Sequence, residues 1–159
     1  MLIMEYRKIV EVEFREYDRE TLDKSWEWLN DPETKELTMI GDFDREYQLK
    51  WFEGLKDRKN FYIRSVICKG EIIGACGLKK ITNEDGEIWG YIGEKKYWGK
   101  TVGAQMMEHI IQYAQSLNLS SIYAVYLKTN RPSIKTSKRF GFVYEKDINE
   151  NEILMRLSF

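Results

Sequence analysis

A short turn, Trp98 to Gly103, separates a strand-like segment from the most strongly periodic helical segment of the chain. Apolar residues after the turn recur at spacings of four, four, three and four, which predicts one face of an amphipathic helix. This stripe consists of Val102, Met106, Ile110, Tyr113 and Leu117. The first N–H groups of a helix have no partner within it, and the helix dipole adds partial positive charge there. Since Gly99 and Gly103 let a ligand approach the backbone closely, the turn predicts an anion site at the start of a long helix.

The segments around this turn predict both kinds of regular structure. Alternating apolar residues between turn-rich boundaries predict strands over residues 10–17, 61–68, 71–80, 87–94, 121–128, 142–147 and 152–159. Helices are expected over residues 18–29, 44–57, 102–117 and 131–140, with a short one whose first turn contains Pro32. The order predicts an α+β fold, with a mixed, mostly antiparallel sheet of about seven strands flanked by about four or five helices.

The composition limits the classes of function. The 159 residues suit one domain, expected to span residues 1–159. The net charge of −1 disfavours a dedicated nucleic-acid binder. Cys68, Cys76 and His109 are too widely spaced for a zinc site, so no metal is expected and the thiols are expected to pack in a core. No stretch approaches the roughly 20 apolar residues that span a bilayer, which favours a cytoplasmic protein without membrane contact.

Two phosphate chemistries use a turn of this kind. The P-loop of nucleoside-triphosphate enzymes ends in a Gly-Lys-Ser/Thr sequence, and Gly99-Lys100-Thr101 is similar to that ending. The first glycine of a P-loop would have to be residue 94, which is Glu, and Gly93 lies one position too early. The next strand, 121–128, also ends without an Asp for magnesium. A P-loop is therefore disfavoured, and an ordinary glycine-containing helix start is a third alternative.

Coenzyme A pyrophosphate is the other phosphate chemistry. The window from Trp98 to Gly103 has the spacing of a Gln/Arg-x-x-Gly-x-Gly/Ala signature, and it follows Tyr91-Ile92-Gly93 at a strand end. About thirty residues later, Asn130-Arg131-Pro132-Ser133 leads into Phe140-Gly141-Phe142. In both motifs the chain resembles the GNAT N-acetyltransferase superfamily. The sequences of its motifs are most similar to those of the branch that includes ribosomal-protein N-terminal acetyltransferases and nucleotide-amino-sugar acetyltransferases.

The resemblance implies a single GNAT-like domain that uses acetyl-CoA as co-substrate. The residues implied to bind the cofactor are Ile92, Gly93, Glu94, Trp98, Gly99, Lys100, Thr101, Val102, Gly103, Ala104, Asn130, Ser133 and Ser137. Two positions depart from the signature, with Trp98 where Gln or Arg is usual and Thr101 where Gly is usual. Because backbone N–H groups hold the phosphates, Thr101 is acceptable if its side chain points away from them.

Acetyl transfer to an amine needs a base for the amine and a donor that polarises the carbonyl. By resemblance, Glu87 at the start of a strand is the base and acts through water. A solvated carboxylate at a strand end is the alternative, and Glu84 or Asp85 could take the role. Backbone N–H groups near residues 92–94 are implied to polarise the carbonyl.

The leaving thiolate also needs an acid. Many relatives carry a Tyr seven residues after the Asn, and this position is Ser137 here. Ser133 fits the pattern of the ribosomal-protein branch, so it is the candidate thiol contact and acid. Asn130 is the candidate for orienting the pantetheine arm. The alternative is that Asn130 and Ser133 only cap a helix.

The acceptor is expected over the first helices, where Trp28, Asn30 and Trp51 are the candidate substrate-binding residues. The sequence around Trp28 and Trp51 resembles GNAT members that acetylate nucleotide-linked amino-deoxy sugars for surface polysaccharides. This acceptor ranks first, a protein N-terminus second, and a polyamine or aminoglycoside third. The available cations for a nucleotide are Arg15, Lys35 and Arg45.

Two further hypotheses concern the whole chain. The missing Tyr and the presence of Thr101 leave a non-catalytic acyl-CoA-binding module as the alternative of another class. The predicted closing hairpin, residues 142–159, could pair with a second subunit, as it does in some relatives, and so form a homodimer.

Overall fold

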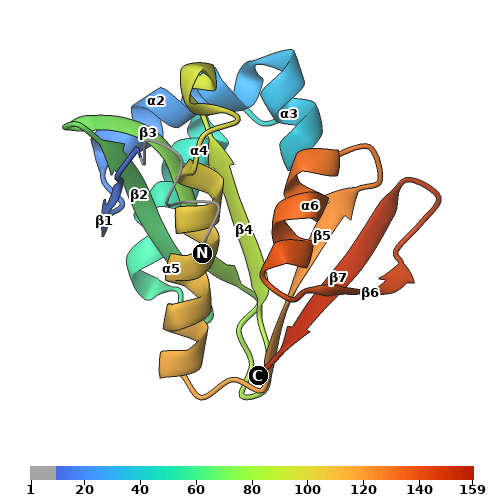
Figure 1. Ribbon diagram of the computed structural model, residues 1–159. Helices are drawn as coiled ribbons and strands as arrows, with labels where there is room; N and C mark the ends of the chain where they lie inside the picture. Colours follow the sequence, from blue (N-terminus) through green and yellow to red (C-terminus); the bar gives the residue numbers. More distant parts are fainter. Residues whose placement is uncertain (1–9) are drawn as a thin grey trace.

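Seven strands form one mixed sheet in the computed structural model, which describes residues 10–159 (Figure 1). The order across the sheet is β1-β2-β3-β4-β5-β7-β6. The strands are β1 (Glu13–Glu16), β2 (Tyr62–Cys68), β3 (Glu71–Lys79), β4 (Glu87–Ile92), β5 (Ser121–Leu127), β6 (Val143–Asp147) and β7 (Glu152–Ser158). The helices are α2 (Arg19–Asn30), α3 (Pro32–Thr38), α4 (Arg45–Glu53), α5 (Val102–Ser116) and α6 (Arg131–Arg139), with short 3-10 turns η1 (Leu55–Asp57) and η2 (Lys95–Tyr97). The predicted α+β class is confirmed.

Three aspartates start the helices of the first third of the chain. The side chains of Asp18, Asp31 and Asp44 each accept a hydrogen bond from the backbone N–H three residues later. Such caps satisfy N–H groups that have no partner within the helix. Pro32 occupies the first turn of α3, as predicted.

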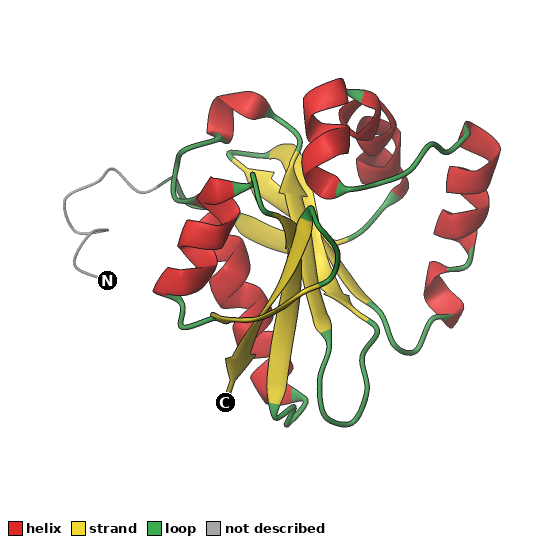
Figure 2. Cartoon of the chain, turned by 90° about the vertical axis from the view of Figure 1, so that its right-hand side faces the viewer, coloured by secondary structure: helices red, strands yellow, loops and turns green. Residues whose placement is uncertain are grey.

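The helices lie on both sides of the sheet, as the quarter-turned view shows (Figure 2). Helix α5 packs on β3, β4 and β5 and also contacts α6. The main core lies on this side, and Cys68 and Cys76 are buried within it as free thiols, as predicted. Helix α2 packs on β3 from the other side and contacts α4. A smaller cluster around Tyr17, Leu22 and Ala75 lies between these elements.

The sheet opens between β4 and β5. These two neighbours are parallel, and they pair only at Glu87 and Tyr123. Beyond that pair they separate toward their carboxyl ends, at the top of the view in Figure 1. β5 is instead paired along its whole length with β7. The turn that leads into α5 follows the carboxyl end of β4, so it lies at the same end of the sheet as the opening.

Two predicted elements end two or more residues earlier than expected, and β1 starts at Glu13 rather than at residue 10. β4 stops at Ile92 because the N–H groups of Gly93 and Glu94 both donate to the carbonyl of Ile73, at 2.7 and 3.2 Å. The predicted helix over residues 44–57 ends at Glu53, and a 3-10 turn follows Gly54. None of the helices between residues 10 and 159 is both long and apolar enough to cross a bilayer.

Candidate active site

The turn before α5 presents backbone donors to the opening. Among the described residues, no acceptor bonds the N–H groups of Val102, Gly103 and Ala104. Gly99 has a φ of +73°, which favours glycine. A Cβ added to Gly103 would meet no atom within 4 Å, so this face of the helix start is open. The turn therefore has the donors, the dipole and the free space that a phosphate needs.

Trp98, which stands where the signature has Gln or Arg, connects the turn to β4. Its indole N–H donates to the carbonyl of Ile92 at 2.8 Å. This carbonyl belongs to the last residue of β4. This hydrogen bond holds the turn against the end of β4.

Thr101 points away from the open face of the turn. It is 8 % exposed, and its hydroxyl accepts a hydrogen bond from the Gln105 amide at 3.0 Å. The same amide donates to the carbonyl of Val10 at 2.6 Å. A side chain at this position is acceptable if it points away from the phosphates, and Thr101 meets that condition.

Replacing Thr101 with Val tests this assignment. The variant loses the hydrogen bond to Gln105, which should cost about 1 kcal/mol of folding stability. The KM for acetyl-CoA should stay within about twofold, because the side chain does not face the phosphates. Thermal unfolding and steady-state kinetics measure the two effects, and a KM raised about tenfold or more at unchanged stability would contradict the assignment.

The opening between β4 and β5 reaches the middle of the sheet. β4 is the fourth of the seven strands, yet its residue Gly90 is exposed. Of the predicted carbonyl-polarising groups, the N–H groups of Gly93 and Glu94 are occupied by Ile73. Successive N–H groups of a strand point to opposite sides, so that of Ile92 points toward β5. Ile92 is therefore the best placed of the three donors for a thioester carbonyl.

The first turn of α6 borders the same opening. Asn130 is buried at the N-cap position, but its side chain makes no capping hydrogen bond. Ser133 is half-buried, and its hydroxyl has no partner among residues 10–159. The structure therefore does not use these two side chains as caps, and both are available to a ligand. Ser137 is placed differently, because it is fully buried and its hydroxyl lies 2.7 Å from that of Tyr126.

Two adjoining cavities lie on the face of the sheet that α2 covers. The first, termed the aromatic cavity, has a volume of about 580 Å³ and is lined by Tyr17, Trp51, Arg58, Phe61, Trp89 and Tyr91 among others. Burial raises the pKa of Tyr17 to about 12 and that of Tyr91 well above its usual value, so both phenols are neutral. The second, termed the charged cavity, has a volume of about 560 Å³ and contains Glu87, Tyr123 and Arg156. Both cavities include Thr38, Met39 and Lys79.

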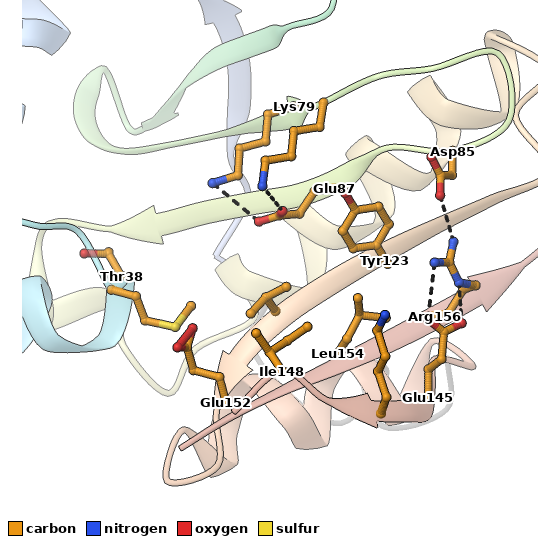
Figure 3. A pocket seen from close by; sticks show the side chains of 14 residues that line it. Thr38, Lys79, Asp85, Glu87, Tyr123, Glu145, Ile148, Glu152, Leu154 and Arg156 are labelled. Carbon is orange, nitrogen blue, oxygen red and sulfur yellow. Dashed lines mark hydrogen bonds and ion pairs between the residues drawn. The ribbon is translucent and has the colours of Figure 1, made fainter. Parts of the chain in front are cut away.

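Glu87 lines the charged cavity, and its carboxylate points toward Lys79, which lines both cavities (Figure 3). It is only 8 % exposed, and its two carboxylate oxygens lie 3.4 Å from the ammonium groups of Lys79 and Lys80. It is therefore not a freely solvated carboxylate. Asp85, one of the proposed replacements, is paired with Arg156 at 3.0 Å.

The predicted acceptor-binding residues separate in the structure. Trp51 lines the aromatic cavity. Trp28 instead packs under Gly93, where an added Cβ would lie 2.0 Å from its ring, and its indole donates to Glu94. Asn30 is exposed, and its amide donates to the carbonyl of Trp26 at 2.7 Å. Neither Trp28 nor Asn30 lines either cavity.

Sequence reasoning missed most of the aromatic cavity. Arg58, Phe61, Trp89 and Tyr91 were not proposed as site residues. A signal existed for two of them, because Trp89 and Tyr91 follow Glu87 at a period of two and so share its face of β4. Phe61 begins the predicted strand 61–68, but its alternation does not say that this face lines a cavity, and Arg58 lies outside the predicted strands and helices.

The family model of the acetyltransferase (GNAT) domain matches residues 11–143. The chain belongs to the GNAT acetyltransferase family. The uncharacterized N-acetyltransferase p20 of Bacillus licheniformis is 29 % identical over 150 residues, which cover 87 % of this chain and 82 % of the relative. The chain is accordingly an N-acetyltransferase.

Two solved structures share this GNAT fold. The N-acetyltransferase PseH of Campylobacter jejuni, in complex with acetyl coenzyme A, has a TM-score of 0.71 at 18 % identity, covering 93 % of this chain and 99 % of that one. The spermidine N-acetyltransferase of Vibrio cholerae, in complex with CoA and spermine, has a TM-score of 0.83 at 17 % identity, covering 92 % and 95 %.

The GNAT fold binds acetyl-CoA, and the residues of this chain fit that cofactor. The donors at the start of α5 suit the pyrophosphate, and the opening beside Gly90 suits an extended arm. Lys100 adds a cation that has no carboxylate within 4.0 Å among the described residues. Between residues 10 and 159 no group of three or more acidic, His or Cys side chains could hold a metal ion.

Proposed function

We propose that this N-acetyltransferase acetylates the amino group of a nucleotide-linked amino-deoxy sugar in the cytoplasm. The observation that carries the proposal is the aromatic cavity. Its walls include Phe61 stacked on Trp89, with ring centroids 5.8 Å apart and planes inclined by 21°. Flat walls of this kind suit a nucleobase or a sugar ring.

The charge of the aromatic cavity supports an anionic acceptor. The guanidinium of Arg58 lies over the rings of Trp51 and Phe61 at 5.7 and 5.6 Å. It has no carboxylate partner among residues 10–159, so it can bind a phosphate. The cavity's carboxylate, Asp42, is already paired with Lys35. A polycationic acceptor such as a polyamine would find an uncompensated cation in this cavity, which disfavours it.

Glu87 is the proposed base for the acceptor amine. It lines the charged cavity, and its carboxylate points toward Lys79, which lines both cavities. In this arrangement the acceptor's ring occupies the aromatic cavity and its amine reaches the opening between β4 and β5. A bound water would link the amine to the Glu87 carboxylate.

A panel of acceptors tests the proposal through the release of free thiol from acetyl-CoA. The panel contains a nucleotide-linked amino sugar, the same sugar without its nucleotide, spermidine, an aminoglycoside and a peptide with a free N-terminus. The nucleotide-linked sugar should give the highest kcat/KM, and loss of the nucleotide should lower it. A peptide as the best acceptor would support the second-ranked function, N-terminal acetylation, and overturn the first.

Replacing Arg58 with Ala should weaken the binding of the anionic acceptor. Hydrogen bonds to a charged group contribute about 1.5–3 kcal/mol, so the acceptor's KM should rise about 10- to 100-fold. The KM for acetyl-CoA should not change. Lys56, an exposed neighbour that does not line the cavity, provides the control variant Lys56→Ala. Equal effects of the two substitutions would show that only the overall charge matters.

A further inference from the structure

In the opening between β4 and β5, Tyr126 on β5 lies at the same level along the strands as the exposed Gly90 on β4. Glu87 and Tyr123 are paired, and three residues further along each parallel strand lie Gly90 and Tyr126. Equal rises along the two strands put these residues at the same level. Tyr126 shares a face of β5 with the buried residues Ile122 and Ala124, which is the face that α5 covers. Its ring therefore lies on the β5 side of the opening, across from Gly90.

The Tyr126 hydroxyl has one partner, and this partner comes from α6. Its oxygen lies 2.7 Å from the Ser137 hydroxyl, which has no other hydrogen bond among the described residues. Ser137 is fully buried, whereas Tyr126 is only partly buried. If Ser137 donates to the phenol oxygen, the phenol hydrogen remains free to be donated to a third group.

We propose that Tyr126 protonates the leaving thiolate of coenzyme A and that Ser137 positions its hydroxyl. When the acceptor nitrogen attacks the thioester carbonyl, a C–N bond forms and the C–S bond breaks. The electron pair of the C–S bond goes to sulfur, which takes the phenol proton. The excess proton on nitrogen leaves through water toward Glu87. As coenzyme A leaves, the phenolate recovers a proton from solvent and Glu87 releases one to solvent, so charge and protons balance over the cycle.

The chemistry of the two hydroxyl types favours Tyr126 over Ser133 as this acid. A phenol has an ordinary pKa of about 10, close to the value of about 8.5 for a thiol, whereas an aliphatic hydroxyl is a far weaker acid. Burial raises the pKa of Tyr126, and the hydrogen bond between Tyr126 and Ser137 lowers it in part. The phenol is therefore protonated at neutral pH. Ser133 stands one helical turn before Ser137 on the same side of α6, where it can contact the thiol without donating the proton.

Replacing Tyr126 with Phe should lower kcat about 30-fold and leave the KM for acetyl-CoA within about twofold. The alkaline limb of the kcat–pH profile that the phenol causes should disappear. As a matched control, Tyr144→Phe removes the hydroxyl of an exposed tyrosine on β6 that lines neither cavity, and it should keep kcat within about threefold. The amine that turns over fastest in the acceptor panel serves as substrate, so the outcome does not depend on which acceptor is correct.

Two further measurements separate catalysis from folding. Tyr126→Phe leaves the Ser137 hydroxyl without a partner, whereas the double variant with Ser137→Ala removes both polar groups. The double variant should recover melting temperature and keep the low kcat. A Tyr126→Phe variant with unchanged kcat would overturn the proposal. A low kcat that the double variant restores along with stability would also overturn it.

Discussion

Replacing Gly103 with Leu should reduce kcat/KM for acetyl-CoA by about 100-fold or more while leaving the fold intact. A Cβ at this position meets open space, so the larger side chain would cover the N–H groups that face the pyrophosphate. Loss of two hydrogen bonds to a charged group, at about 1.5–3 kcal/mol each, corresponds to that reduction or a larger one. Titration calorimetry with acetyl-CoA and steady-state kinetics measure it.

Thermal unfolding provides the control for this prediction. Leu is a better helix former than Gly by up to about 1 kcal/mol, so the melting temperature of the free variant should not fall. Saturating acetyl-CoA should stabilise the natural protein by about 2.7 kcal/mol at 100 times Kd, and the variant hardly at all. Thr101→Val is the matched control, because it changes the same turn on the side away from the phosphates. Normal acetyl-CoA affinity in Gly103→Leu would show that the cofactor does not use this turn.

Most of the fold could be predicted because its signals are local. Each of the three aspartate caps is followed by a helix, and the spacing of apolar residues from Val102 marks α5. The separation of β4 from β5 could not be predicted in this way. It depends on β5 pairing with β7, which is about thirty residues away in the chain, and no pattern within either strand indicates it.

The two halves of the candidate site, the turn before α5 and the acceptor cavity, also differ in whether their signals are local in the sequence. The candidate phosphate-binding turn is one continuous segment, and Thr101 meets the condition that its side chain point away from the phosphates. The acceptor cavity is assembled from separate segments. Trp28 was an acceptor candidate because it is a large aromatic residue in the right region, but in the structure it packs under Gly93. Sequence alone does not say which aromatic side chains face a cavity and which fill the core.

The charged residues show the same limit. Arg15, Lys35 and Arg45 were the cations that the sequence offered for a nucleotide. In the structure they are paired with Glu13, Asp42 and Asp23 respectively. Arg58, which was not proposed, has no such partner among residues 10–159 and lies on the aromatic cavity. Whether a cation is available depends on the acids that folding brings near it.

Replacing Glu87 with Gln should lower kcat about 100-fold at neutral pH without a comparable change in either KM. Gln has nearly the same shape but cannot accept the amine proton, and a positioned base typically contributes about 10²- to 10⁴-fold. Because only the free amine attacks, the rate of the variant should rise with pH until the acceptor itself is deprotonated. The loss should therefore shrink as pH increases.

The ion pairs of Glu87 require a separate control, because removing a buried carboxylate also leaves two lysines without a partner. Lys80→Met breaks one of the pairs at a side chain that is 69 % exposed, and Lys79 remains. It should keep kcat within about threefold, since screened pairs of this kind contribute about 1 kcal/mol or less. In Glu87→Ala the space left beside the charged cavity could admit formate, and added formate should restore part of the rate. If Glu87→Gln kept normal kcat, or if Lys80→Met lost as much as Glu87→Gln, the carboxylate would have a structural role and the base would have to lie elsewhere on the cavity wall.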